Sequence, residues 1–259
     1  MTYQLTWLPE VLLGAGLKVA EVPGWRTRGR GDMGRVQAVT LHHTATSRQG
    51  NYPSLALVRD GRGPPNALPG PLCHVGLGRD GTWYVVAAGR ANHAGSGNYR
   101  GMTDGNGQSI GIEAENNGVG EKWPAVQLES YKHGCAAMLK KIGANPIMCH
   151  GHREYTRRKI DPTGINMDAF RYDVGVIMGG LAPHPVLVPP LDAKQRPTLF
   201  RGSKGPLVIV VQKVLEVNPD GKYGPATESA VRKFQRECDL VPDGRVGPKT
   251  WEAIDEEEK

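Results

Sequence analysis

The part of this 259-residue chain that most constrains its fold is residues 149–162, which read C-H-G-H-R-E-Y-T-R-R-K-I-D-P. Two histidines, a lysine and an aspartate lie close together there, and imidazole and carboxylate groups are common zinc ligands. The residue before a proline is disfavoured in a helix, so we expect residues 155–162 to form a loop. A loop can direct His152 and Asp161 at one point, which neither a helix nor a strand does at a spacing of nine.

A third metal ligand must come from elsewhere, because a catalytic zinc site uses three protein ligands and a water. Residues 36–41 (V-Q-A-V-T-L) are apolar and β-branched, and they predict a buried strand. His42 and His43 follow at its C-terminal end, where sites often lie in α/β sheets. Successive strand side chains point to opposite faces, so we expect only one of the two to reach the metal. Cys149 is an alternative to His152, which lies three residues further on.

A second strand is predicted at residues 109–115 (S-I-G-I-E-A-E), where polarity alternates. Ile110 and Ile112 share one face, and Glu113 and Glu115 share the other. A carboxylate flanked by isoleucines needs a polar partner, and a water held by a metal is one. The alternation does not distinguish Glu113 from Glu115 in that role.

The clearest helix is predicted at residues 128–142, where apolar side chains recur at steps of three and four. Gly143 is expected to cap this helix. His133 lies off the apolar stripe, so we expect it at the surface.

Five motifs follow one another along the chain: V-T-L-H-H-T-A-T (39–46), C-H-V-G-L-G-R-D-G-T-W-Y (73–84), A-N-H-A-G (91–95), S-I-G-I-E (109–113) and G-H-R-E-Y-T-R-R-K-I-D-P (151–162). In this order they resemble the zinc N-acetylmuramoyl-L-alanine amidases of the type-2 amidase family. That family includes phage endolysins, bacterial amidases that recycle wall fragments, and animal peptidoglycan recognition proteins. The resemblance implies an α/β fold with a mixed central β-sheet flanked by helices.

The resemblance also implies a zinc ligand set. In such amidases the first histidine of the H-H-T element, the histidine of G-H-x-E and the aspartate before proline bind zinc. These residues are His42, His152 and Asp161 in this chain. The expected cofactor is therefore Zn²⁺.

Further roles follow from the same resemblance. The glutamate that ends S-I-G-I-E is the general base in part of the family, which assigns this role to Glu113. The lysine two residues before the metal aspartate is Lys159, which we expect to be catalytic and to stabilise negative charge beside the metal. The histidine of A-N-H-A-G lies by the substrate cleft, so His93 is a candidate substrate contact. Many members have a tyrosine where this chain has Cys73, and we therefore place the base role on Glu113 alone.

An internal repeat marks the last part of the chain: P-D-G-K-Y-G-P-A-T (219–227) recurs as P-D-G-R-V-G-P-K-T (242–250). Each copy joins an Asp-Gly turn to a proline that opens a helix. With a helical pattern at residues 207–217, this predicts a small three-helix bundle. The motifs V-x-x-F-Q (231–235) and D-G-x-x-G-x-x-T-W (243–251) resemble the type-1 peptidoglycan-binding domain.

The expected domain organisation is a catalytic domain at residues 1–180, a linker at 181–197 and a peptidoglycan-binding domain at 198–259. The linker assignment follows from composition, because residues 182–197 are rich in proline, which favours extended chain.

The charge of the chain limits the classes of partner that it is expected to bind. The formal net charge of +6 comes from the first 197 residues, since the remainder is nearly balanced. Positive charge can attract an anionic polymer. No basic run with interleaved aromatics indicates nucleic acid, so bacterial peptidoglycan is the expected partner, and we expect a monomer.

The four cysteines form no C-x-x-C pair, and free thiols are expected.

Targeting signals are not evident in the sequence. The N-terminus lacks the basic and apolar regions of a signal peptide, and no stretch approaches the ~20 apolar residues of a membrane helix. We therefore expect synthesis in a host cytoplasm, no membrane insertion, and release to the wall through a phage holin pore.

The expected function is an endolysin that cleaves the amide bond between N-acetylmuramic acid and L-alanine with zinc-activated water. Two alternatives stay open. One is a zinc peptidase that cuts the stem peptide of peptidoglycan, and the other is a peptidoglycan-binding protein without catalysis.

Overall fold

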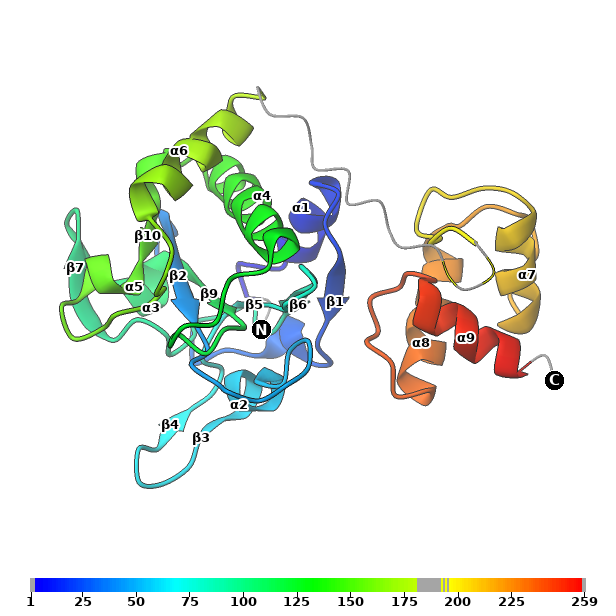
Figure 1. Cartoon of the computed structure of the whole chain (residues 1–259), viewed down its shortest axis with the longest axis horizontal. Helices are drawn as coiled ribbons and strands as arrows, with labels where there is room; N and C mark the ends of the chain where they lie inside the picture. Colours follow the sequence, from blue (N-terminus) through cyan, green and yellow to red (C-terminus); the bar gives the residue numbers. More distant parts are fainter. Residues whose placement is uncertain (1–2, 181–191, 193, 195, 258–259) are drawn as a thin grey trace. The chain divides into compact units, whose positions relative to one another are not determined.

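The computed structural model describes residues 3–180, 192, 194 and 196–257 (Figure 1). The chain divides into two compact units, Met1–Val186 and Leu187–Lys259. Most of the predicted linker lies outside the described residues, so the boundaries at 180 and 198 stay a prediction. In the described part of the chain, no helix combines the length and the apolar character needed to cross a bilayer.

A six-stranded sheet forms the centre of the first unit, in the order β1-β6-β5-β9-β2-β10. Its strands are β1 (Val19–Glu21), β2 (Ala38–His43), β5 (Val75–Leu77), β6 (Trp83–Val85), β9 (Ser109–Ala114) and β10 (Cys149–Gly151). Four neighbouring pairs are parallel and the β5–β6 pair is antiparallel. The sheet is therefore mixed, and the predicted fold class is confirmed.

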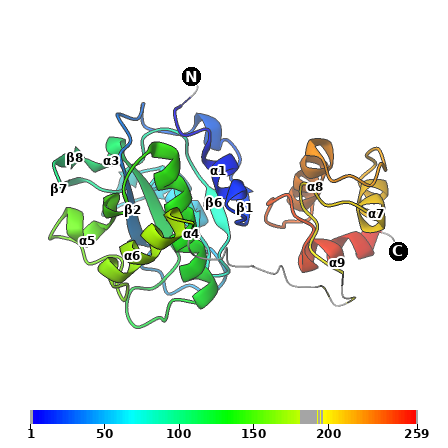
Figure 2. The ribbon, with the colours of Figure 1, turned by 90° about the horizontal axis from the view of Figure 1, so that it is seen from above.

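Three helices pack beside one another against the sheet: α1 (Leu8–Gly14), α4 (Ala125–Ile142) and α6 (Met167–Met178) (Figures 1 and 2). The prediction of a helix at 128–142 is confirmed, and α4 ends at Gly143, whose φ of 66° is left-handed. The expectation for His133 is wrong, because only 4% of this residue is exposed. Since α1 packs against α4 as well, α4 is buried on more than one stripe.

Short elements make up the rest of the first unit. They are α2 (Leu55–Asp60), the hairpin of β3 (Gly61–Arg62) and β4 (Leu68–Pro69), the hairpin of β7 (Ser96–Tyr99) and β8 (Met102–Asp104), α3 (Gly105–Gln108), α5 (His152–Tyr155) and two 3-10 turns at Trp25–Thr27 and Pro146–Met148. Tyr155 ties several of them together: its hydroxyl accepts from the Gly105 N–H at 3.0 Å and donates to the Thr103 carbonyl at 2.8 Å.

The structure changes along residues 149–162, and the predicted loop begins at Thr156, one residue later than expected, because Tyr155 ends α5. Cys149–Gly151 pairs in parallel with residues 39–41 of β2, which satisfies backbone groups at that edge. The next four residues form α5, and the Glu154 carboxylate accepts from the Gly151 N–H at 2.8 Å. The part that approaches Pro162 has no regular structure, as the proline predicts.

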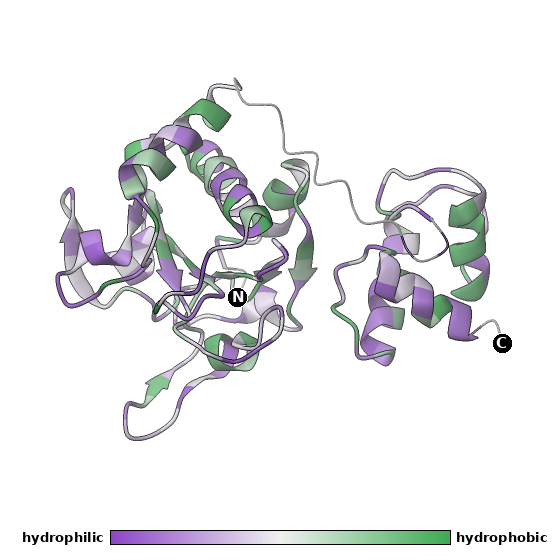
Figure 3. Ribbon diagram, viewed as in Figure 1, coloured by the Kyte–Doolittle hydropathy of each residue, from purple (hydrophilic) through white to green (hydrophobic). Residues whose placement is uncertain are grey.

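The second unit contains three helices, α7 (Pro206–Val214), α8 (Pro225–Glu237) and α9 (Pro248–Glu257). Each begins with a proline, which suits the first turn of a helix. Trp251, which is fully buried, lies in their shared core, and α7 is mostly apolar (Figure 3). The predicted three-helix bundle is confirmed.

The internal repeat builds two equivalent hydrogen-bonded turns. Gln212 donates to the Asp220 carboxylate at 2.8 Å and to Thr227 Oγ1 at 3.0 Å, and it accepts from the Gly221 N–H at 2.8 Å. Gln235 makes the same set of bonds in the second copy. The repeated Asp-Gly and Thr positions therefore hold each turn around a buried glutamine.

Candidate metal centre and active site

Three neighbouring parallel strands bring the predicted site residues into one row. His42 in β2 pairs with Glu113 in β9, and directly paired residues point to the same face of a sheet. On the other side of β2, Gly151 pairs with Leu41, so His152 follows at the next position. The three side chains meet at the carboxyl ends of β9, β2 and β10, where α/β sheets commonly place sites.

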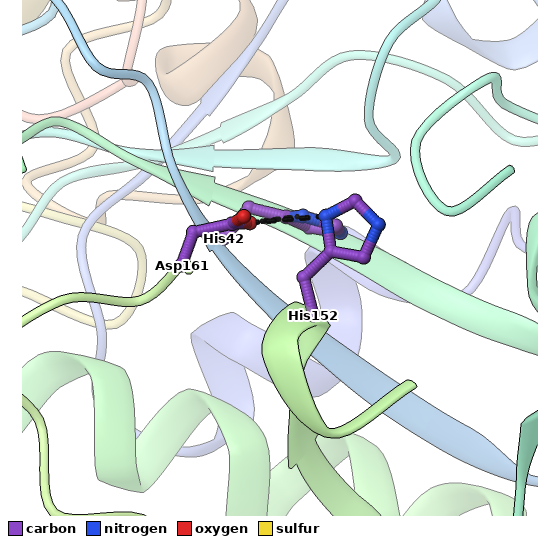
Figure 4. A group of neighbouring side chains, drawn as sticks. All are labelled: His42, His152 and Asp161. Atoms are coloured by element: carbon purple, nitrogen blue, oxygen red, sulfur yellow. Dashed lines mark hydrogen bonds and ion pairs between the residues drawn. The ribbon is translucent and has the colours of Figure 1, made fainter. Parts of the chain in front are cut away.

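His42, His152 and Asp161 lie together in space (Figure 4). The Asp161 Oδ2 atom is 2.9 Å from His42 Nδ1 and 3.1 Å from His152 Nδ1. One potential ligand atom from each residue lies within 4.8 Å of the others, and all three residues are buried. Among the described residues this is the one group of His, Cys, Asp and Glu side chains that could hold a metal ion.

The hydrogen-bond partner of His152 and the lowered pKa of His42 indicate that this group suits a cation. His152 Nε2 lies 3.0 Å from the Ala94 carbonyl oxygen, which can only accept, so Nε2 carries the hydrogen. In the neutral ring, the Nδ1 lone pair then points at the Asp161 carboxylate. Burial lowers the pKa of His42 to about 4, so this ring is neutral near pH 7. An imidazole lone pair from His152, the Nδ1 atom of the neutral His42 ring and a carboxylate oxygen that face one point fit a divalent metal.

The neighbouring candidates have other partners. His43 Nδ1 accepts the Thr163 N–H at 3.1 Å, so of the two adjacent histidines only His42 belongs to the group. Cys149 is buried in β10 and is not part of the group either. Burial raises the pKa of the Cys73 thiol well above its usual value, which keeps it protonated.

Glu113 faces a cavity beside this group. The cavity has a volume of about 610 Å³ and is lined by His42, His152, Asp161 and His93 among others. Glu113 Oε2 is buried there and has no hydrogen-bond partner among the described residues. Burial, reinforced by the nearby Asp161 carboxylate, raises the pKa of Glu113 well above its usual value. A proton-transfer partner that enters the cavity would meet this free oxygen.

Glu115, which strand alternation left equivalent to Glu113, has a different environment. Its carboxylate accepts the Thr44 hydroxyl at 2.6 Å, the Ser54 hydroxyl at 3.0 Å and the Ser54 N–H at 3.1 Å. The residue is fully buried and does not line the cavity. Its carboxylate therefore joins β9 to the residues that follow β2 and precede α2.

The rim of the cavity carries positive charge. Lys159, Arg158 and Arg62 all line it. Lys159 is exposed, and its ammonium group opposes the rise in the pKa of Glu113. The Arg158 guanidinium donates to the Ser96 carbonyl at 2.7 Å. A cavity with this rim can receive an anionic ligand.

Two residues at the site could not be predicted from sequence patterns. Tyr131 belongs to the predicted apolar stripe of α4, yet its hydroxyl donates to the His42 carbonyl at 3.2 Å. Asn106 lines the cavity from α3, in a glycine-rich segment without periodicity. Both residues are distant in sequence from His42, which lies in the same site.

Comparison with protein families assigns both parts of the chain. The model of the N-acetylmuramoyl-L-alanine amidase family matches residues 32–164, which is more than half of the chain. The chain belongs to the N-acetylmuramoyl-L-alanine amidase family. The model of the putative peptidoglycan binding domain matches residues 205–254. The protein is thus an amidase with peptidoglycan as its partner, and its candidate metal centre lies inside the amidase match.

Several solved structures are similar to this amidase. The AmpD selenomethionine derivative shares 23% identity and covers 60% of this chain and 94% of its own, with a TM-score of 0.47. The amidase LysC from Clostridium intestinale shares 16% identity over 61% of this chain and 97% of its own, with a TM-score of 0.46. The AmiD amidase from E. coli, solved with an anhydro-N-acetylmuramic acid peptide substrate, shares 18% over 88% and 90%, with a TM-score of 0.43. No curated protein sequence matches the chain.

Proposed function

We propose that this protein is a zinc-dependent hydrolase that cleaves the amide bond between N-acetylmuramic acid and L-alanine in peptidoglycan. The observation that carries the proposal is the group of His42, His152 and Asp161 beside a Glu113 oxygen that has no partner among the residues described. The membership of the chain in an amidase family selects the bond, because the ligand set alone indicates only metal-assisted hydrolysis.

In this proposal His42, His152 and Asp161 hold the zinc ion. Two neutral imidazoles and a carboxylate are a ligand set that zinc accepts in catalytic sites. When bound, zinc supplies a Lewis acid that activates water and polarises a carbonyl oxygen. The Asp161 carboxylate suits this position because it is buried and its Oδ2 atom lies close to the Nδ1 atoms of both histidines.

Glu113 moves the proton. Its free Oε2 in the cavity accepts a proton from the attacking water and then delivers it to the leaving amine. The raised pKa makes the Glu113 carboxylate a stronger base toward the water than an ordinary glutamate, and the carboxylic acid that forms can donate the proton. Lys159 at the rim stabilises the negative charge that develops on the substrate carbonyl oxygen.

Substrate recognition is divided between the two parts of the chain. The cationic rim of the cavity faces the acidic stem peptide, and His93, which lines the cavity, is a proposed substrate contact. Residues 1–180 would then form the catalytic domain and residues 198–259 the wall-binding domain, with a linker at 181–197. The family match at residues 205–254 supports the second assignment.

Mass analysis of digested peptidoglycan tests the proposed reaction. We expect glycan strands with free lactyl carboxylates and intact stem peptides that begin with L-alanine. Removal of metal with a chelator should abolish the products, and added zinc should restore them. Cleavage within the stem peptide would instead identify a zinc peptidase, and a wall that is bound but not cut would identify a binding protein.

We further propose that the protein acts as a phage endolysin that is monomeric, made in the host cytoplasm and released through a holin pore. An amidase and a wall-binding domain in one chain support this role. Expression in a bacterial cytoplasm should cause lysis only when a pore-forming holin is expressed too. Lysis without the holin, or a dimer in size-exclusion chromatography, would contradict the corresponding part.

A further inference from the structure

Residues 93–95 lie behind both metal-facing histidines, on the side away from Asp161. His42 Nε2 is 3.0 Å from His93 Nδ1, and His152 Nε2 is 3.0 Å from the Ala94 carbonyl oxygen. Two histidines from segments far apart in sequence therefore have their outer nitrogens in contact with two consecutive residues. Such outer partners fix the orientation of a ligand ring and the position of its hydrogen.

No regular element fixes this segment, since residues 91–95 belong to no helix or strand. Its three consecutive backbone N–H groups all donate to one side chain instead. Asn106 Oδ1 accepts the N–H groups of His93 at 3.0 Å, Ala94 at 2.7 Å and Gly95 at 3.3 Å. Three consecutive N–H groups that converge on one oxygen leave the backbone little freedom.

We propose that Asn106 is a positioning residue of the metal centre: its side-chain oxygen fixes residues 93–95, which in turn orient His42 and His152. This inference rests on the proposed function, because it assigns a role toward the proposed zinc ion. It gives His93 a contact with a metal ligand in addition to its place in the cavity wall.

Packing around the segment restricts it further. The His93 ring lies directly over Gly111 of β9, where a side chain would collide with it. The segment is therefore enclosed between the strand that carries Glu113 and the α3 residue that holds its backbone. The Asn106 end is anchored as well, because the Tyr155 hydroxyl accepts the N–H of the preceding Gly105.

Zinc affinity of the full chain, measured by competition with a chromophoric chelator, tests this role. We expect Asn106→Ala to weaken zinc binding by about 10- to 100-fold, as loss of an outer partner typically does. Asn106→Asp keeps the accepting oxygen and should retain wild-type affinity or better. Asn166→Ala is the matched control, because Asn166 Oδ1 accepts two backbone N–H groups at the start of α6. This control should lose thermal stability without losing zinc affinity.

The outcomes separate the inference from the proposed function. Wild-type protein that binds no zinc would overturn both. Wild-type protein that binds zinc, with Asn106→Ala within about twofold of it, would overturn only the positioning role. If Asn106→Ala does not fold, His93→Ala removes the His42 partner alone, and unchanged zinc affinity in that variant would overturn the proposal in the same way.

Discussion

Glu113 and Glu115 show how two identical side chains, two residues apart, differ in what surrounds them. Glu113 has a buried oxygen at the cavity that no described residue hydrogen-bonds, and Glu115 accepts three hydrogen bonds from Thr44 and Ser54. A buried acceptor with full hydrogen bonding contributes to stability, whereas an unpartnered one has an energetic cost. The first environment is typical of a reacting group and the second of a structural one.

Replacement of each glutamate by its amide separates the two roles. Glu113→Gln should lower hydrolysis of peptidoglycan by at least about 100-fold, because proton transfer is lost, while the melting temperature and zinc content stay near wild type. Glu115→Gln should cost about 1–3 kcal/mol of unfolding free energy, because an NH₂ group would face the donors of Ser54 and Thr44.

Activity per folded molecule and denaturant unfolding check both variants. Full activity of Glu113→Gln would exclude Glu113 as the base. An inactive but stable Glu115→Gln would reverse the assignment.

At the scale of elements, the position of α4 against the sheet depends on a glycine. Gly134 lies where α4 meets the Trp83 ring of β6, and an added Cβ would overlap that ring. Trp83 is fully buried, and its Nε1–H donates to Ser130 Oγ at 2.9 Å, so the ring cannot move without loss. Alanine is normally better than glycine in a helix by about 1 kcal/mol. Here the close approach of helix and strand outweighs that preference.

Two glycine-to-alanine variants measure this effect. Gly134→Ala should lower the unfolding free energy by about 1–3 kcal/mol, the usual range for overpacking. Gly14→Ala in α1 is the matched control, because in the described part of the chain no atom outside the adjoining backbone of α1 lies within 4 Å of its added Cβ. It should be neutral or stabilise by up to about 1 kcal/mol. Urea unfolding compares the two, and equal stabilisation would show that α4 can shift away from Trp83.

At the scale of the whole molecule, buried histidines couple the fold to pH. Burial lowers the pKa of His74 and of His150 to about 3, and neither belongs to the candidate metal centre. The unfolded chain binds protons at the ordinary histidine pKa of about 6.5. Between these values the unfolded state holds more protons than the folded state, so stability rises with pH.

Unfolding of metal-free protein should therefore become easier as the pH falls from 6.5 toward 4. Each buried histidine contributes up to about 1.4 kcal/mol per pH unit in that window, and the contribution is fully present above it. Denaturant melts between pH 4 and 8 measure the slope. His74→Gln, whose amide oxygen can still accept the Gly111 N–H, should reduce the slope by about one proton. A flat profile would contradict the prediction.

The second unit has a hydrophobic core of its own around Trp251. Deletion of residues 198–259 should therefore leave hydrolysis of a small soluble muropeptide within about twofold of wild type, while binding to insoluble wall falls by tenfold or more, since a tethered second site raises effective concentration. Co-sedimentation with purified wall and a soluble-substrate assay measure the two effects. Loss of soluble activity in a folded truncation would show that the second unit takes part in catalysis.

The sequence by itself determined the elements and the ligand types. An apolar β-branched run predicted β2, alternating polarity predicted β9, the apolar stripe predicted α4, and the motif order pointed to the family and to His42, His152 and Asp161. These signals are local, because periodicity and residue chemistry can be read within a short window.

Only the tertiary structure showed what surrounds each member of a pair that strand alternation or adjacency left equivalent. It separated Glu113 from Glu115 and His42 from His43, and it placed His133 in a buried interface. It also brought Asn106 onto the segment behind both histidines. The physical reason is that burial and hydrogen bonding depend on which distant segments pack together, and strand alternation assigns a face without showing what that face meets.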